Sequence, residues 1–187
     1  MSRKHLLLIG FTAMLLLGLN GCGQSNDPKQ HPLLGAVYEQ LTVKRDVELF
    51  ASAERKDKDV VVTITLHNLS QKPITSVQSW LSYDPKQLKA KTIKVDNSAF
   101  TLTAPYENQF DNDKGLVRLG RANNKPISDV RIMVAQVTFE RLTNQIAMLN
   151  FYDYQTSLTG HTSVNMLVNN VPYNVLKEPI NPAVVIR

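Results

Sequence analysis

The chain of 187 residues contains a single cysteine, Cys22, and no block of lysines and arginines. One cysteine excludes an intrachain disulfide framework and a cluster of thiolate metal ligands. Basic residues alternate with acidic ones, and the formal net charge is +5. Because no basic patch is written into the sequence, we expect no nucleic-acid partner.

Catalytic motifs are scarce as well. No Gly-x-Ser-x-Gly nucleophile motif occurs, and only three histidines follow the N-terminal apolar run: His31, His67 and His161. We place His31 in a polar linker, and His67 and His161 in exposed turns. The sequence therefore predicts a protein that is not an enzyme and that holds no cofactor.

An acidic turn, residues 111–115 (DNDKG), invites comparison with a calcium-binding EF-hand loop. Its glycine comes one place too early, and position twelve is Ala122 rather than glutamate, so the match fails. A hairpin turn is the interpretation that we favour. The alternative is a site in which Asp111, Asp113 and Glu107 gather around calcium. We expect no metal.

No apolar run reaches the roughly 20 residues that a membrane-spanning helix needs. The longest, Leu6–Leu19, follows a short basic start with Arg3 and Lys4. A basic start before a short apolar run is typical of a secretory signal peptide, which we assign to residues 1–21. An uncleaved membrane anchor is the less favoured alternative.

The end of this run, Leu19-Asn20-Gly21-Cys22, resembles the lipobox of bacterial lipoproteins. The resemblance implies cleavage before Cys22 and acylation of its thiol and new amine, which anchors the protein to a lipid bilayer. The next residue is Gly23 rather than an aspartate. In a Gram-negative host that residue favours the outer membrane, facing the periplasm or the surface, so we expect a lipid-anchored protein of the cell envelope.

Residues 22–45 form the second region, the lipidated cysteine and a tether. The segment is polar, is interrupted by Pro28 and Pro32, and shows no hydrophobic period until the ambiguous residues 36–42. Such composition is typical of a flexible linker. We therefore expect the folded domain to occupy residues 46–187.

Short runs of strand-forming residues recur through that domain, separated by turn residues, and Val60–Leu66 alternates strictly. The charged stretch Glu54–Asp59 reads as a loop. About eight or nine short strands with turns between them predict an all-β sandwich. They are drawn from ten candidate runs: Val47–Ala51, Val60–Leu66, Ser76–Tyr83, Thr92–Val95, Phe100–Thr103, Leu116–Leu119, Val130–Arg141, Ile146–Tyr154, Thr162–Val168 and Ala183–Ile186.

Three stretches of these strands resemble the cohesin family. They are SVQSWLSYDPKQLKA (residues 76–90), NQFDNDKGLVRLGRA (108–122) and VAQVTFE (134–140). The resemblance implies a jelly-roll-type β-sandwich of about nine strands. It also implies a non-catalytic module whose partner is a protein, such as a dockerin, or, as in related families, a polysaccharide.

Candidate binding residues follow from strand parity. Trp80 shares its parity with Gln78 and not with the apolar Val77 and Leu81, so it is expected on the outward face, where Arg118 is also a candidate. We take Trp80, Gln78 and Arg118 as the binding residues of a membrane-anchored module. The alternative function is a structural accessory lipoprotein of a secretion or pilus assembly, without a ligand of its own.

Overall fold

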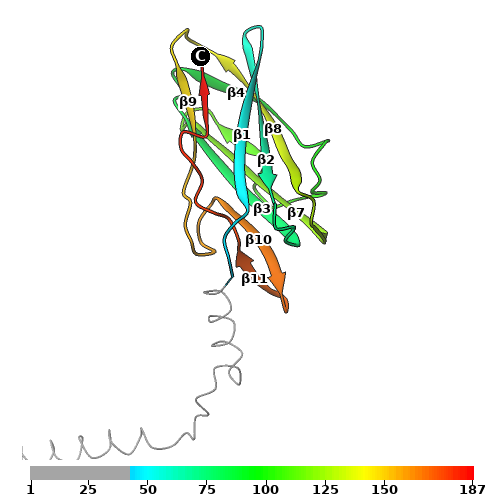
Figure 1. Ribbon diagram of the computed structural model, residues 1–187. Helices are drawn as coiled ribbons and strands as arrows, with labels where there is room; N and C mark the ends of the chain where they lie inside the picture. Colours follow the sequence, from blue (N-terminus) through cyan, green and yellow to red (C-terminus); the bar gives the residue numbers. More distant parts are fainter. Residues whose placement is uncertain (1–42) are drawn as a thin grey trace, which may run out of the picture. The chain divides into compact units, whose positions relative to one another are not determined.

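Two antiparallel β-sheets pack face to face across residues 43–187, the part of the chain that the computed structural model describes (Figure 1). The predictions for Cys22, His31, the signal peptide and most of the tether lie outside these residues. The twelve strands are β1 (Glu48–Lys56), β2 (Asp59–His67), β3 (Ile74–Tyr83), β4 (Leu88–Lys94), β5 (Leu102–Thr103), β6 (Gln109–Asp111), β7 (Leu116–Ile127), β8 (Arg131–Arg141), β9 (Ala147–Phe151), β10 (Ser163–Val168), β11 (Val171–Asn174) and β12 (Val184–Ile186).

The smaller sheet has the strand order β1-β2-β8-β4, which leaves β1 and β4 at its edges. The larger sheet runs β11-β10-β3-β7-β5, and β6 also pairs with β7. One end of β3 pairs with β10 and the other with β9, which carries β12 on its far side. β3 and β7 are therefore the central strands of the larger sheet. No segment of residues 43–187 forms a helix of the length and apolarity that crossing a membrane requires.

The alternating pattern of β2 produces the core as predicted. Val60, Val62, Ile64 and Leu66 are buried, whereas the residues between them are half-buried on the other face. A strand whose side chains alternate between two faces buries one set against the opposite sheet. The all-β sandwich is thus confirmed.

The alternation predicted for β8 is interrupted by a bulge. Ile64 pairs with Ala135 but Thr65 pairs with Met133, so Val134 is the extra residue. Both Val134 and Ala135 are fully buried. A bulge shifts strand parity by one residue, and it brings apolar side chains before and after it to the same core.

The prediction of several strands was incomplete. β1 continues to Lys56 and turns at Asp57, whose φ is 58°, so residues 54–56 are strand rather than loop. β6 and β11 were not expected, and β7 extends to Ile127. These segments are exposed, charged or interrupted by proline, and they lack the apolar period on which strand prediction depends.

The cohesin-like residues at the end of β3 join the two sheets. The Tyr83 hydroxyl donates to the side-chain oxygen of Asn112 at 2.6 Å. That same oxygen accepts the backbone N–H of Ala90 on β4, and the Asn112 amide donates back to the Ala90 carbonyl. Gly115 has a φ of 61°, and a Cβ there would lie 2.0 Å from the Tyr83 carbonyl oxygen. These cohesin-like residues therefore have a structural role: their hydrogen bonds link β3 of one sheet to β4 of the other.

Candidate functional site

Trp80 lies on the outward face of the larger sheet, as its parity predicted. It is half-buried, between the buried Ser79 and Leu81. Across the sheet it pairs directly with Arg118 of β7. Two of the three predicted binding residues are therefore neighbours.

On the other side of Trp80 the sheet divides, because β9 ends at Phe151 and β10 begins at Ser163. Thr162 fills the gap: its hydroxyl donates to the Tyr152 carbonyl at 2.6 Å and accepts the Trp80 N–H at 3.3 Å. Thr162 is completely buried. The loop 152–162 therefore leaves the sheet beside Trp80 and places its side chains around the indole.

Two residues of this loop cover the indole. The His161 ring stacks on Trp80 with centroids 3.9 Å apart, and Tyr152 lies at 6.2 Å with nearly parallel rings. His161 Nδ1 is hydrogen-bonded to the Asp153 carboxylate, and this bond is the main cause that lowers the pKa of Asp153. The prediction of His161 as an exposed turn residue was incomplete: the residue lies in a bend with its side chain 45% exposed, but its ring also packs against the candidate site.

Arg118 and Glu107 complete the surroundings of Trp80. The Arg118 guanidinium carbon lies 5.8 Å from the indole centroid, within range of a cation–π interaction. The indole N–H donates to both Glu107 carboxylate oxygens at 3.1 Å. Burial raises the pKa of Glu107, against the opposing effects of the Trp80 hydrogen bond and the Arg118 charge. The indole N–H, which is the polar group of the Trp80 side chain, is therefore already hydrogen-bonded within the domain.

Gly120 makes room for Glu107. A Cβ at Gly120 would lie 2.5 Å from the Glu107 Cγ and 2.9 Å from its Cβ, which is closer than carbon atoms can approach. Gly120 pairs with Gln78 across β3 and β7. The absence of a side chain beside Gln78 lets Glu107 lie flat over the sheet and reach the indole.

Glu107 lies at the end of a tight turn, and an exposed aromatic residue occupies the tip of that turn. The Glu107 N–H donates to the Ala104 carbonyl, and Pro105 and Tyr106 lie between them. Tyr106 has a φ of 62°, which the third residue of a type II turn requires and which usually selects glycine. Its side chain is 83% exposed. A large aromatic in this strained and exposed position is a strong candidate for contact with a partner.

An apolar strip continues the same face. Ser82 pairs with Asn150 of β9, and Met148, the next outward residue of β9, pairs with Val185 of β12. Met148 and Val185 are 50% and 43% exposed. We call the surface formed by Trp80, Arg118, Gln78, Tyr106, Tyr152, Met148 and Val185 the Trp80 face.

The other residues considered from the sequence lie elsewhere. His67 is at the end of β2 in the smaller sheet, where its ring packs on Phe50 at 4.2 Å. Asp111 accepts the backbone N–H groups of Asp113 and Lys114, which is a hairpin-turn arrangement. Within residues 43–187 no three histidine, cysteine or acidic side chains are grouped to hold a metal ion. The Asp111 hydrogen bonds and the pairing of Asp111 with Leu116 form the favoured hairpin turn, and the Glu107 carboxylate binds the Trp80 indole instead.

Solved structures share this architecture. A type II cohesin domain from the cellulosome of Acetivibrio cellulolyticus is similar with a TM-score of 0.52 and 18% identity, over 76% of this chain and 95% of that one. The seventh ScaB type I cohesin from Pseudobacteroides cellulosolvens gives a TM-score of 0.51 and 16% identity, over 72% and 87% of the two chains. At these identities the likeness concerns the fold, and it confirms the predicted jelly-roll-type sandwich.

Sequence comparison agrees with the fold. Curated protein sequences gave no match. A family model described as the cohesin domain matches residues 47–169, well over half of the 187 residues, and it spans the interlocked Tyr83 turn and most of the Trp80 face. The chain belongs to the cohesin domain family.

Proposed function

We propose that this protein is a membrane-anchored binding module whose protein partner docks on the Trp80 face. Cohesin domains are non-catalytic binding modules, in agreement with the expectation that the protein is not an enzyme. The observation that carries the proposal is the exposed Tyr106, held in a left-handed conformation next to Glu107, whose carboxylate binds the Trp80 indole.

The Trp80 face has the composition of a protein-binding surface. Exposed aromatic rings, an arginine and an apolar strip lie on strands of one rigid sheet, and interfaces are enriched in tyrosine, tryptophan, methionine and arginine. Glu107 and His161 hold the indole in place before any partner arrives. Side chains that are already ordered lose little conformational entropy on binding, which favours affinity.

A protein partner fits this surface better than a polysaccharide. Sugar recognition relies on an open aromatic face, but the Trp80 ring already stacks with His161 and its N–H is bound by Glu107. A partner of the dockerin type is the one that the family resemblance implies. Binding of a soluble polysaccharide to the purified domain in affinity electrophoresis would favour the glycan alternative.

The proposed anchor is Cys22. The motif Leu19-Asn20-Gly21-Cys22 supports lipidation, and Gly23 supports the outer membrane in a Gram-negative host. Labelling of producing cells with an alkyne fatty acid tests this assignment. Label in the wild-type protein that disappears in Cys22→Ser is the expected result, and equal labelling of both proteins would refute the anchor.

The docking surface is tested by capture from detergent-solubilised envelope of the source cells. Arg118→Glu reverses a charge on the Trp80 face, and Arg131→Glu makes the same change on the exposed start of β8 in the other sheet. We expect a partner captured by the wild type to be retained by Arg131→Glu and lost with Arg118→Glu. Equal capture of one large complex by all three proteins would favour the structural accessory lipoprotein.

A further inference from the structure

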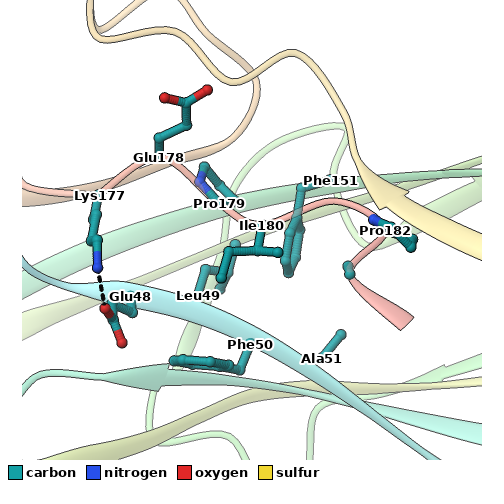
Figure 2. A pocket seen from close by; sticks show the side chains of 11 residues that line it. Glu48, Leu49, Phe50, Ala51, Phe151, Lys177, Glu178, Pro179, Ile180 and Pro182 are labelled. Carbon is teal, nitrogen blue, oxygen red and sulfur yellow. Dashed lines mark hydrogen bonds and ion pairs between the residues drawn. The ribbon is translucent and has the colours of Figure 1, made fainter. Parts of the chain in front are cut away.

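An apolar groove runs along the outer edge of β1, in the smaller sheet (Figure 2). Its volume is about 230 Å³, and the segment 177–183 forms its opposite wall. Leu49, Phe151 and Ile180 converge in its centre. Ile180 is 79% exposed although it is a large apolar residue. An apolar groove with such a residue at its rim is a candidate contact surface for another chain.

The backbone of β1 is unpaired along this edge. Val47 directs its N–H and C=O away from β2, to the Val175 carbonyl and the Lys177 N–H. In an antiparallel ladder the backbone groups of every second residue point to the same edge. Counted from Val47, the groups that face away from β2 belong to Leu49, Ala51, Ala53 and Arg55. In the part of the chain that the structure describes, these four residues make no backbone hydrogen bond on that side.

The segment 177–183 does not pair with this edge. It follows the Val47–Leu176 bridge, and among the described residues no further bridge joins it to β1. Pro179 and Pro182 have no N–H to donate, and the next strand, β12, pairs with β9 instead. Exposed strand edges of this kind are prone to pair with other chains.

The second half of β1 extends past the groove. Residues 52–56, which we call the arm, line no part of the groove, and all five are exposed. The edge of β1 therefore consists of a groove along residues 48–51 and a free arm that follows it. The arm of one molecule has the length and the open backbone needed to enter the groove of another.

We propose that β1 pairs with β1 of a second copy of this chain, antiparallel about a two-fold axis at Ser52. In this register Leu49 of each copy lies opposite Arg55 of the other, and Ala51 lies opposite Ala53. These four are the residues with open backbone groups, so one pairing satisfies the edge of both copies. Such an interface is isologous, because the same patch of each copy contacts its equivalent.

The inner side of the arm fits the groove. Leu49 lies in the core and Ala51 packs against it, so the residues opposite them in the second copy face the same side of the sheet. Ala53 would place a small apolar side chain in the groove. The aliphatic stem of Arg55 would cover Ile180, with its guanidinium left in water.

Charges on the outward side of β1 favour this register. With the axis at Ser52, Glu48 of each copy lies opposite Lys56 of the other, so that opposite charges meet twice. Shifting the axis by one residue towards the N-terminus would instead place Glu48 opposite Glu54, and like charges that are directly opposite destabilise a sheet. The Glu48 carboxylate binds Lys177 at 2.7 Å and has acceptor positions left for a second lysine.

The pairing would join the smaller sheets of the two copies into one continuous sheet. β3 and β7, which carry Trp80 and Arg118, belong to the larger sheet and take no part in it. The dimer would therefore present two Trp80 faces. A partner with two docking sites would bind such a dimer more tightly than it binds a monomer.

Disulfide trapping of the full-length chain tests the axis. In a Cys22→Ser background, Ser52→Cys places two thiols across the axis, in a pair whose Cα atoms lie about 4.5 Å apart. Glu54→Cys is the matched control, because the proposed register separates its two copies by about 13 Å along the strands. We expect mild oxidation to link Ser52→Cys into a dimer at least about tenfold faster than Glu54→Cys. Equal rates, or no dimer from Ser52→Cys, would overturn the proposal.

Charge reversal tests the same interface without a cysteine. Lys56→Glu should raise the dissociation constant of the dimer about tenfold, because the dimer contains the Glu48–Lys56 pair twice. Lys94→Glu makes the same change at an exposed position of β4, the other edge strand of the sheet, and should leave the constant unchanged. Adding Glu48→Lys to Lys56→Glu restores opposite charges and should recover the dimer. Sedimentation equilibrium of the full-length chain in density-matched detergent measures each constant.

The remaining outcomes of sedimentation are also decisive. A wild-type chain that stays monomeric at every concentration would overturn the proposal. A dimer that Lys56→Glu and Lys94→Glu weaken equally would place the interface elsewhere and would overturn it as well. Trp80 fluorescence checks each variant: a Lys56→Glu chain that dissociates but keeps the wild-type emission has lost the interface and not the fold, which is the expected result.

Discussion

The indole N–H of Trp80 donates to both carboxylate oxygens of Glu107, each at 3.1 Å. This bidentate contact links the centre of β3 to the turn that carries Tyr106. Because Trp80 is the only tryptophan in the chain, its fluorescence reports directly on the contact. The candidate face is therefore organised by a relationship that can be measured without a partner.

Gly120→Ala should disturb this contact. The new Cβ would lie 2.5 Å from the Glu107 Cγ and 3.0 Å from the Ala104 Cβ. Overpacking of this kind costs about 1–3 kcal/mol of unfolding free energy. Urea denaturation followed by Trp80 fluorescence should show the loss together with a shifted native emission maximum. An unchanged spectrum and stability would mean that Gly120 does not determine the position of Glu107.

The pKa of Glu107 predicts a pH dependence. Burial holds this pKa above its ordinary value near 4.5, against the Trp80 hydrogen bond and the Arg118 charge. The folded state therefore binds the proton more tightly than the unfolded state, and stability from this group falls as pH rises above about 4.5. In Glu107→Gln that titration is absent.

Denaturation of both proteins at about pH 4 and pH 7 checks this sign. The stability of the wild type minus that of Glu107→Gln should decrease from the lower to the higher pH. The carboxylates with lowered pKa values, Asp46, Asp111 and Asp153, occur in both proteins, so their opposite trend cancels in the difference. A difference that grows with pH would contradict the assignment.

Asn112→Ala should destabilise the fold more than a neighbouring substitution. It leaves the Tyr83 hydroxyl and the Ala90 backbone groups without their partner. Half-buried polar groups without partners cost about 2–3 kcal/mol in total. Asp113→Ala, in the same turn but exposed, should change stability by less than about 0.5 kcal/mol. Equal losses of stability for the two variants in denaturant titrations would show that the Asn112 hydrogen bonds between the two sheets do not stabilise the fold.

Tyr106→Gly should separate stability from binding. Glycine adopts the φ of 62° without strain, so the variant should be as stable as the wild type or about 1 kcal/mol more stable. If Tyr106 contacts the partner, the same variant should bind more weakly. Calorimetric unfolding and a titration with the captured partner measure the two effects, and a variant that is less stable yet binds normally would reverse both assignments.

The fold was largely predictable because apolar alternation is strong where strands are buried. Val60–Leu66 shows the clearest period and forms the strand expected. The bulge at Val134 was not predictable, since Val134 and Ala135 fit an uninterrupted alternation equally well until the register with β2 is known. Exposed or proline-containing strands such as β6 and β11 carry little periodic signal.

The candidate site was predictable only in part. Parity placed Trp80 and Arg118 on one face, because both lie in regular central strands. The positions of Glu107 and His161 depend on two loops that approach Trp80 from opposite sides of β3. The spacing of residues in the sequence does not predict that these loops contact Trp80. The Pro105-Tyr106 pair was a usable signal, because proline favours the second position of a type II turn.

Photocrosslinking from the Trp80 face tests the central claim most directly. A photoreactive phenylalanine analogue replaces Tyr106, Tyr152 or, as a control of similar exposure to Tyr106, Leu69. The proposed function predicts adducts with one protein partner from Tyr106 and Tyr152 and none from Leu69. Adducts with that partner from Leu69, and none from Tyr106 or Tyr152, would contradict it.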